Sequence, residues 1–182
     1  LATYLVMCRK KVKEAHVDTS LIYAYAKSTQ FAQLEEFISA PNVGRIQDVA
    51  ERCYMEEMYE AAKLLFNSIS NFSRLATCLM HLGEHQAAVD AARKANSTRT
   101  WKEVNASCVE HQEFRLAQIC ALNIIVNPDE LDELIASYEK HGHFDEVIAV
   151  MEGGLGLERA HMGIFTELGV LYSKYRDSKL ME

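Results

Sequence analysis

The sequence predicts an all-α fold, a solenoid of about five to six stacked, short helical hairpins. Five aromatic-type residues recur at intervals of 28, 26, 29 and 30 residues, and they are Phe31, Tyr59, His85, Phe114 and Phe144. Apolar residues recur with them at helical spacing. Only two prolines and eight glycines punctuate the chain, which argues against an all-β fold. A repeat of this length with apolar columns is typical of stacked helical hairpins.

We call the five recurring residues the register marks. Four apolar columns accompany them, at ten and six positions before each mark and at three and six positions after it. The columns before the marks contain Leu21, Val49, Leu75, Val104 and Leu134, and then Tyr25, Cys53, Leu79, Cys108 and Tyr138. The columns after the marks contain Leu34, Ala62, Ala88, Ala117 and Val147, and then Phe37, Leu65, Ala91, Cys120 and Val150. Each repeat therefore predicts two amphipathic helices that meet near the mark.

The third repeat shows most clearly how one hairpin is built. Leu75, Leu79 and Leu82 form the apolar stripe of a first helix. Gly83 can adopt the left-handed conformation that ends a helix, and a second helix begins at Glu84 and His85. The inner face of that second helix is small, with alanines at 87, 88, 91, 92 and 95, which lets two helix backbones approach closely.

The other elements follow in order. Leu1, Leu5, Cys8 and Val12 share one face of an opening helix. The first helices of the remaining hairpins end at residues 29–30, 56–57, 111–112 and 141–142. Turn-forming residues connect successive hairpins at 40–42, 67–71, 95–97, 127–129 and 153–154. Because the opening is already helical, we expect the chain to be part of a longer solenoid, with residues 1–182 as one continuous piece without an internal domain boundary.

Bulk composition excludes several classes of function. The net charge of −7 argues against nucleic-acid binding, which needs a basic surface. No apolar run approaches the roughly 18 residues that cross a bilayer, and the start of the chain has no signal-peptide cleavage site. Repeats of 34 residues, and of about 40–47 residues, define two common helical solenoids, and the shorter, variable period here fits neither.

We expect no catalytic, cofactor-binding or metal-binding residues and no cofactor. The five cysteines have no metal-ligand spacing, and we expect them to be small buried apolar residues in a reducing compartment. His81 and His85 are four residues apart, but Gly83 interrupts the helix between them and the order differs from the HExxH zinc motif. Histidines at hairpin turns could respond to pH, although such exposed histidines are usually inert. The glycines at 153–156 lack the preceding strand and spacing of a dinucleotide loop.

Two basic clusters are candidate protein-binding surfaces. The first contains Arg9, Lys10, Lys11 and Lys13. The second surrounds the single tryptophan and contains Arg93, Lys94, Arg99, Trp101 and Lys102. Cations beside an aromatic residue favour an acidic helix or peptide as a partner, with the tryptophan as an apolar anchor. The alternative is a solvated connection between repeats whose tryptophan packs on the next hairpin.

Several stretches resemble the leg of the clathrin heavy-chain family. They are LIYAYAKSTQFAQLEEFI (21–38), CYMEEMYEAAKLL (53–65), AARKANSTRTWKEV (91–104), EFRLAQIC (113–120) and GLGLERAHMGIFTELGVLYSKY (154–175). The resemblance covers essentially the whole chain and places it in the proximal leg, which implies a right-handed zigzag of short helices. It further implies a structural, non-enzymatic role in the coats of endocytic and trans-Golgi vesicles, on the cytosolic face of coated pits and vesicles.

The same resemblance implies the partners. They are the clathrin light chain, which lies along the proximal leg as an extended helix, and other heavy-chain legs in the triskelion lattice. The adaptor-reading propeller and the trimerisation segment of that family are absent from these residues. The resemblance makes the second basic cluster, around Trp101, the expected light-chain site. The alternative function is that of an α-solenoid subunit in another membrane-trafficking or tethering complex.

Overall fold

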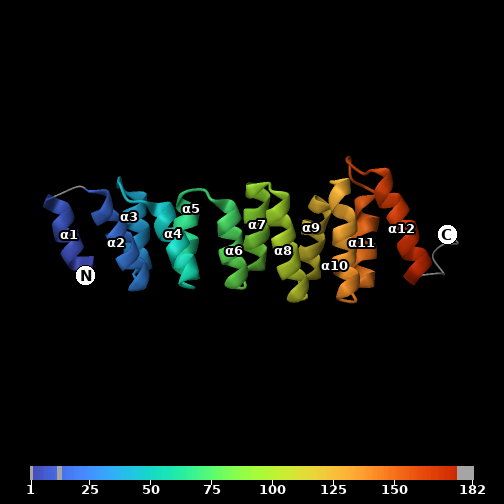
Figure 1. Cartoon of the computed structure of the whole chain (residues 1–182), viewed down its shortest axis with the longest axis horizontal. Coiled ribbons are helices and arrows are strands. Elements are labelled where there is room, and N and C mark those ends of the chain that lie inside the picture. Colours follow the sequence, from blue (N-terminus) through green and yellow to red (C-terminus); the bar gives the residue numbers. More distant parts are fainter. Residues whose placement is uncertain (1, 12–13, 176–182) are drawn as a thin grey trace. The chain divides into compact units, whose positions relative to one another are not determined.

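The computed structural model describes residues 2–11 and 14–175, and in this part of the chain it is entirely helical (Figure 1). Twelve α-helices and one short 3-10 helix follow one another, and the described residues contain no β-strand. The predicted all-α fold of stacked helical hairpins is therefore confirmed. The predicted face of the opening helix is only partly described, because Leu1 and Val12 lie outside the described residues.

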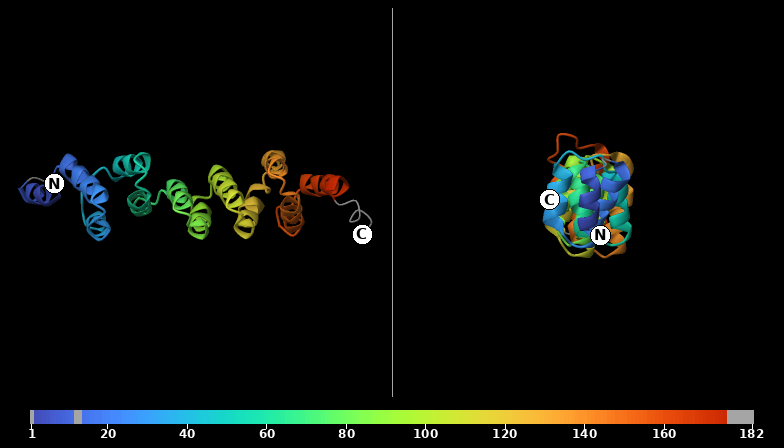
Figure 2. Two further views of the ribbon diagram at one scale, coloured as in Figure 1. Left: turned by 90° about the horizontal axis from the view of Figure 1, so that it is seen from below. Right: turned by 90° about the vertical axis from the view of Figure 1, so that its left-hand side faces the viewer.

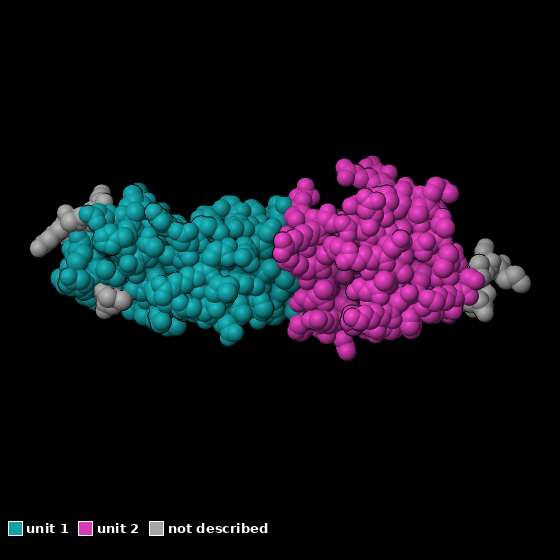
Figure 3. Space-filling view, in the orientation of Figure 1, with its two compact units in different colours: residues 1–95 teal, residues 96–182 magenta. Residues whose placement is uncertain are grey.

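The chain divides into two compact units, residues 1–95 and residues 96–182 (Figure 3). The continuity of the solenoid through both units, and its right-handed twist, stay predictions.

Unit 1 contains one leading helix and three hairpins. Its helices are α1 (Ala2–Lys11), α2 (Ala15–Lys27), α3 (Phe31–Ser39), α4 (Ile46–Met55), α5 (Tyr59–Ser68), α6 (Phe72–His81) and α7 (His85–Ala95). Helix α2 packs on α4 and α3 packs on α5, whereas the third hairpin packs on the second through α6 and α5. The left view of Figure 2 shows two rows of helices within the unit.

Unit 2 contains two hairpins and a following helix. Its helices are α8 (Thr98–Glu110), α9 (Phe114–Ile124), η1 (Pro128–Glu130), α10 (Leu131–Lys140), α11 (Phe144–Gly154) and α12 (Met162–Tyr175). The turn before α10 is built as predicted, because the Asn127 side chain accepts a hydrogen bond from the Asp129 amide and Pro128 opens the 3-10 turn. Helix α11 packs between α9 and α12.

The register marks and their columns explain why these segments fold as hairpins. Each mark is the first residue of the second helix of its hairpin, in α3, α5, α7, α9 and α11. Nineteen of the twenty column residues are buried, and only Tyr25 is partly exposed. The columns are therefore the core of each unit, and burial of their apolar surface is the main term that stabilises the stack.

Every hairpin turn has the same hydrogen-bonded geometry. The residue two positions before each mark is left-handed, with φ of 55° at Thr29, 60° at Glu57, 75° at Gly83, 60° at Gln112 and 77° at Gly142. The amide one position before the mark donates to the carbonyl six positions before it, as Glu84 donates to Leu79 at 2.9 Å. This Schellman motif satisfies the last carbonyls of each first helix. The predicted role of Gly83 is confirmed, although three of the five turns use a residue other than glycine.

Candidate protein-binding surfaces

The described residues contain no group of three or more His, Cys, Asp or Glu side chains placed to hold a metal ion. His81 stacks on the ring of Tyr59 at 4.4 Å and lies 3.2 Å from the hydroxyl of Tyr54 through its Nε2 atom. His85 is buried at the start of α7, beyond the left-handed Gly83. The two histidines of the HLGEH segment thus have separate structural surroundings. None of the described helices is long and apolar enough to span a bilayer.

The described cysteines are free thiols, and four of them are buried in the hairpin cores. Burial raises the pKa of the Cys53 thiol to about 11 and that of the Cys78 thiol to about 12. Both thiols therefore stay protonated at neutral pH, as expected of small apolar core residues.

Successive hairpins are joined by polar contacts between residues about one repeat apart. In unit 1, Glu56 accepts hydrogen bonds from the Tyr23 hydroxyl at 2.7 Å and the Arg52 Nε at 2.9 Å. The hydrogen bond from Tyr23, followed by that from Arg52, lowers the pKa of the Glu56 carboxyl. In unit 2, Glu139 accepts from Lys174 at 2.9 Å and from the Tyr175 hydroxyl at 2.8 Å. These contacts fix one hairpin on the next and leave fewer charges free for partners.

The second basic cluster lies on helix ends rather than on a long loop, because only residues 96 and 97 separate α7 from α8. Two of its members belong to unit 1. Arg93 is exposed and lies 3.4 Å from Asp90. The Lys94 ammonium lies 5.4 Å from the centre of the Phe72 ring. Both cations lie in the last turn of α7, where their positive charge interacts favourably with the negative end of the helix dipole.

The other three members lie in the first turns of α8, in unit 2. Arg99 is almost fully exposed and pairs with Glu103 on its own helix at 2.9 Å. Lys102 lies between Glu130 and Glu133, at 2.8 Å and 2.5 Å, and these hydrogen bonds raise its pKa. Trp101 is only 5% exposed. Its burial leaves little indole surface for a partner, and Lys102 is already neutralised within the unit.

The first basic cluster is described only at Arg9, because residue 13 and the side chains of residues 10 and 11 lie outside the described part. The guanidinium of Arg9 makes two hydrogen bonds within unit 1. Its Nε donates to Asp18 Oδ1 at 2.9 Å, and its Nη2 donates to the Pro41 carbonyl at 2.9 Å. It also lies 4.6 Å from the centre of the Phe37 ring. Arg9 therefore acts as a clamp between α1, α2 and the end of α3.

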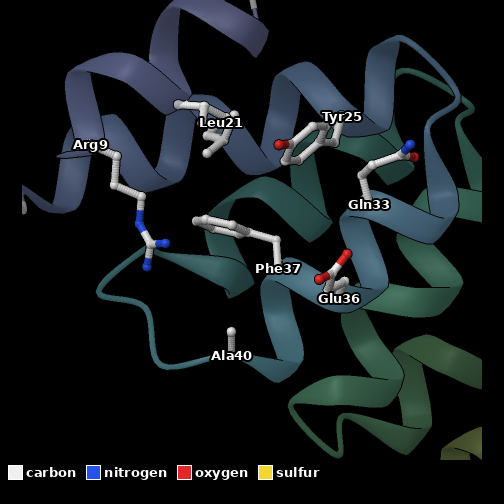
Figure 4. Close-up of a pocket in the computed structure, with 8 residues that line it drawn as sticks. Arg9, Leu21, Tyr25, Gln33, Glu36, Phe37 and Ala40 are labelled. Carbon is white, nitrogen blue, oxygen red and sulfur yellow. The ribbon is translucent and has the colours of Figure 1, made fainter.

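A groove that the sequence analysis missed opens beside this clamp (Figure 4). It has a volume of about 500 Å³ and lies between α1, α2 and α3. Its lining consists of Val6, Arg9, Leu21, Tyr25, Gln33, Glu36, Phe37 and Ala40. The labelled side chains in Figure 4 surround one open space, with Arg9 on one side and Gln33 and Glu36 on the other. We call it the α1–α3 groove.

A smaller groove occupies an equivalent position of the repeat in unit 2, with a volume of about 130 Å³ between α9, α10 and α11. Tyr138 lines it at the column position that Tyr25 occupies in the α1–α3 groove. Tyr138 is buried and accepts a hydrogen bond from Asn105 at 3.0 Å, and burial raises its pKa to about 12. A tyrosine in this column is the one sequence signal that the two grooves share.

Comparison with known proteins identifies the family to which the chain is similar. A family model described as "Region in Clathrin and VPS" matches residues 1–116 and 122–182. Over all 182 residues the chain is 59% identical to the clathrin heavy chain of Dictyostelium discoideum and 58% identical to that of Drosophila melanogaster. It is likewise 59% identical to clathrin heavy chain 1 of Arabidopsis thaliana. The chain spans 11% of the length of each of these relatives.

Proposed function

The chain belongs to the family of clathrin and VPS repeats, and from this premise we propose that it is a structural segment of a clathrin-type vesicle coat. In this role it supplies part of a leg that forms lattice edges in endocytosis and intracellular transport. The observation that carries the proposal is the 59% identity to a clathrin heavy chain over the full length of the chain. An identity of this extent exceeds the share of buried residues, so it must include positions outside the core.

The architecture supports a structural role. Within each unit the apolar columns form a core that runs from hairpin to hairpin, so load passes through packed helices. The contacts of Glu56 in unit 1 and of Glu139 in unit 2 tie neighbouring hairpins at the surface. We propose that the segment is not an enzyme and acts in the cytoplasm, on the cytosolic face of coated pits and vesicles. A subunit of another trafficking or tethering complex is less favoured, because the full-length similarity is to clathrin heavy chains.

A chimaera tests the coat role. The corresponding segment of the Dictyostelium heavy chain is replaced by these 182 residues, and the chimaera is expressed in cells that lack their own heavy chain. We expect triskelia that assemble into closed coats by electron microscopy and restored uptake of fluid. The control is the host segment reinserted at the same junctions. A chimaera that folds and trimerises but forms no lattice would contradict the proposal.

We further propose that other heavy-chain legs and the clathrin light chain are the partners of this segment. The proposed light-chain surface is the second basic cluster of Arg93, Lys94, Arg99, Trp101 and Lys102. Within it, Arg93 of unit 1 and Arg99 of unit 2 are both exposed, and the charge of each can steer an acidic helix. Trp101 supports the surface from below, since it is buried, and Lys102 holds α8 on the acidic residues that precede and begin α10.

Charge reversal tests the light-chain surface without disturbing the core. Arg93→Glu and Arg99→Glu are combined, and binding of the light-chain helix is measured by isothermal titration calorimetry. We expect affinity to fall about tenfold or more, a change that corresponds to roughly 1.4 kcal/mol. Arg45→Glu is the matched control, because Arg45 is similarly exposed but lies before α4. Equal binding by the double variant and the control would remove this cluster as the light-chain site.

A further inference from the structure

We propose that the α1–α3 groove binds a short segment of a partner protein that combines apolar side chains with a basic one. This binding activity goes beyond the coat role, because it would recruit a separate protein to the side of the solenoid. The proposal stands on the shape of the groove, on its apolar lining and on a carboxylate at its rim that makes no ion pair within the described residues.

The floor of the groove is apolar and already ordered. Leu21 is 1% exposed and Phe37 is 8% exposed, so these two core-column residues form the packed base of the groove. The partly exposed Val6 and Tyr25 supply the apolar surface that a partner can contact. The Phe37 ring packs against Tyr25, with their centres 6.1 Å apart. The volume of about 500 Å³ falls in the range of cavities that bind ligands. An entering leucine or phenylalanine side chain would therefore be shielded from water without a rearrangement of the floor.

Arg9 forms one wall of the groove, and its positive charge is paired within the protein. The Arg9 guanidinium donates hydrogen bonds to Asp18 and to the carbonyl of Pro41, both at 2.9 Å. Asp18 is 1% exposed, so this ion pair is sheltered from solvent. An arginine neutralised in this way shapes the groove but does not attract an acidic partner. A wall that is ordered before binding reduces the entropy lost when a peptide docks.

The opposite rim sets the charge of the occupant. Glu36 and Gln33 line the groove from α3, and both side chains are exposed. Within the described residues, Glu36 makes no ion pair and the Gln33 amide makes no hydrogen bond. A carboxylate without a partner beside an apolar floor complements a lysine or arginine flanked by apolar residues. The amide of Gln33 can bond to the backbone of the same peptide.

The groove in unit 2 shows what closes such a site. Its volume is about 130 Å³, and Tyr138 is buried and held by Asn105. Tyr25 lines the larger groove from the same column position and is only partly buried. The repeat therefore forms the same kind of groove in both units, and in unit 1 it leaves room for a side chain.

The probe for a test is a fluorescein-labelled peptide, Gly-Lys-Leu-Lys-Phe-Lys-Gly, and the readout is fluorescence anisotropy with the 182-residue chain at physiological salt. We expect saturable binding and about tenfold weaker binding to Glu36→Lys. Glu35→Lys is the matched control, because it makes the same charge change on the same helix outside the groove lining. We expect it to change affinity less than about twofold, since exposed charges that make no direct contact contribute little.

A second variant tests the cavity itself. Gln33→Trp should fill the groove and abolish binding, while circular dichroism shows unchanged helix content because Gln33 is exposed.

Each of several results would overturn the proposal. They are no saturable binding, equal binding of a peptide with glutamate in place of lysine, and equal loss in both charge-reversed variants. Self-association that Gln33→Trp disrupts would assign the groove to a second copy. Loss of binding in the longer heavy chain would assign it to an adjoining segment of that chain.

Discussion

Asn105 should be one of the residues on which the stability of unit 2 depends most. It is 4% exposed, and its side-chain amide donates to the Ala117 carbonyl at 2.8 Å and to the Tyr138 hydroxyl at 3.0 Å. It thereby joins α8 to α9 and to α10. Asn105→Leu keeps nearly the same side-chain shape, so the substitution removes two hydrogen bonds and leaves little cavity.

The expected loss of stability follows from the two acceptors that lose the Asn105 donor, the Ala117 carbonyl and the Tyr138 hydroxyl. An unsatisfied buried acceptor costs about 1–3 kcal/mol. The Ala117 carbonyl keeps its hydrogen bond within α9, so the loss there is smaller than at Tyr138. We therefore expect Asn105→Leu to lower the free energy of unfolding of unit 2 by about 2–4 kcal/mol. Tyr138→Phe removes the second acceptor but leaves Asn105 bonded to Ala117, and should cost only about 1 kcal/mol.

Urea denaturation followed by tryptophan fluorescence is the appropriate assay. Trp101 is the only tryptophan and lies buried in unit 2, so its emission reports the unfolding of that unit. A loss of about 3 kcal/mol would move the urea midpoint by about 1–3 M, because the free energy of unfolding usually falls by about 1–3 kcal/mol per M of urea. Asn123→Leu is the control, because its amide bonds only to Ile119 in its own helix and is exposed. It should change stability by less than about 0.5 kcal/mol.

A double-mutant cycle separates the hydrogen bond from other effects. Because Asn105→Leu and Tyr138→Phe remove opposite ends of one contact, their costs should not add, and we expect a coupling of about 1 kcal/mol. The pKa of Tyr138 should also rise further in Asn105→Leu, because the hydrogen bond from Asn105 lowers it. Additive costs together with an unchanged tyrosine titration would refute the reasoning.

Three further predictions follow from the same structure. Thr29→Gly should stabilise unit 1 by about 0.5–1 kcal/mol in thermal unfolding, because a β-branched residue is strained at φ of 55°. Gly154→Ala should destabilise unit 2 by about 1 kcal/mol, at the low end of overpacking costs, because its Cβ would lie 2.6 Å from the terminal Cδ1 methyl of Ile125, which must shift. Gly169→Ala meets nothing within 4 Å and should stabilise unit 2 by about 0.5–1 kcal/mol. Hydrogen bonds from Lys174 and Tyr175 lower the folded-state pKa of Glu139, so their stabilisation is complete above the unfolded pKa and is lost as pH falls through the folded one. Glu139→Gln should therefore flatten the decline of the urea midpoint below about pH 4.5, and an unchanged decline would contradict this cause.

The hairpins could be predicted from sequence because their core has a fixed register. A mark begins the second helix in all five hairpins, and the column residues around it are almost all buried. Turn geometry was only partly predictable. Gly83 and Gly142 signal a left-handed turn, but Thr29, Glu57 and Gln112 do not. At those three positions the hydrogen bonds of the Schellman motif hold the backbone in a conformation that the residue itself disfavours.

The α1–α3 groove could not be predicted from the columns alone. A column position needs an apolar side chain of suitable volume. Tyr25 and Phe37 meet this requirement whether or not open space remains beside them, so the columns do not reveal the groove. The groove depends on how far α1 lies from α3, which is set by Arg9 and its contacts with Asp18 and Pro41. Contacts between residues 9 and 32 positions apart leave no periodic pattern in the sequence.

In a solenoid of this kind, a charged side chain often finds its partner about one repeat further along the chain. Lys102 belongs to a run of cations in the sequence, yet its partners Glu130 and Glu133 lie 28 and 31 positions later. The same offset joins Tyr23 to Glu56, which are 33 positions apart. A residue on one hairpin faces the next hairpin at nearly the same height, so a separation close to one period brings the pair into contact. A cluster of cations along the chain therefore overstates the positive charge available to a partner. The cations available to attract a partner protein are those that make no ion pair with the neighbouring hairpin. Among the described residues, Arg99 pairs only within its own helix, whereas Lys102 pairs with Glu130 one period away. Arg99 is therefore the better candidate of the two for contact with a partner.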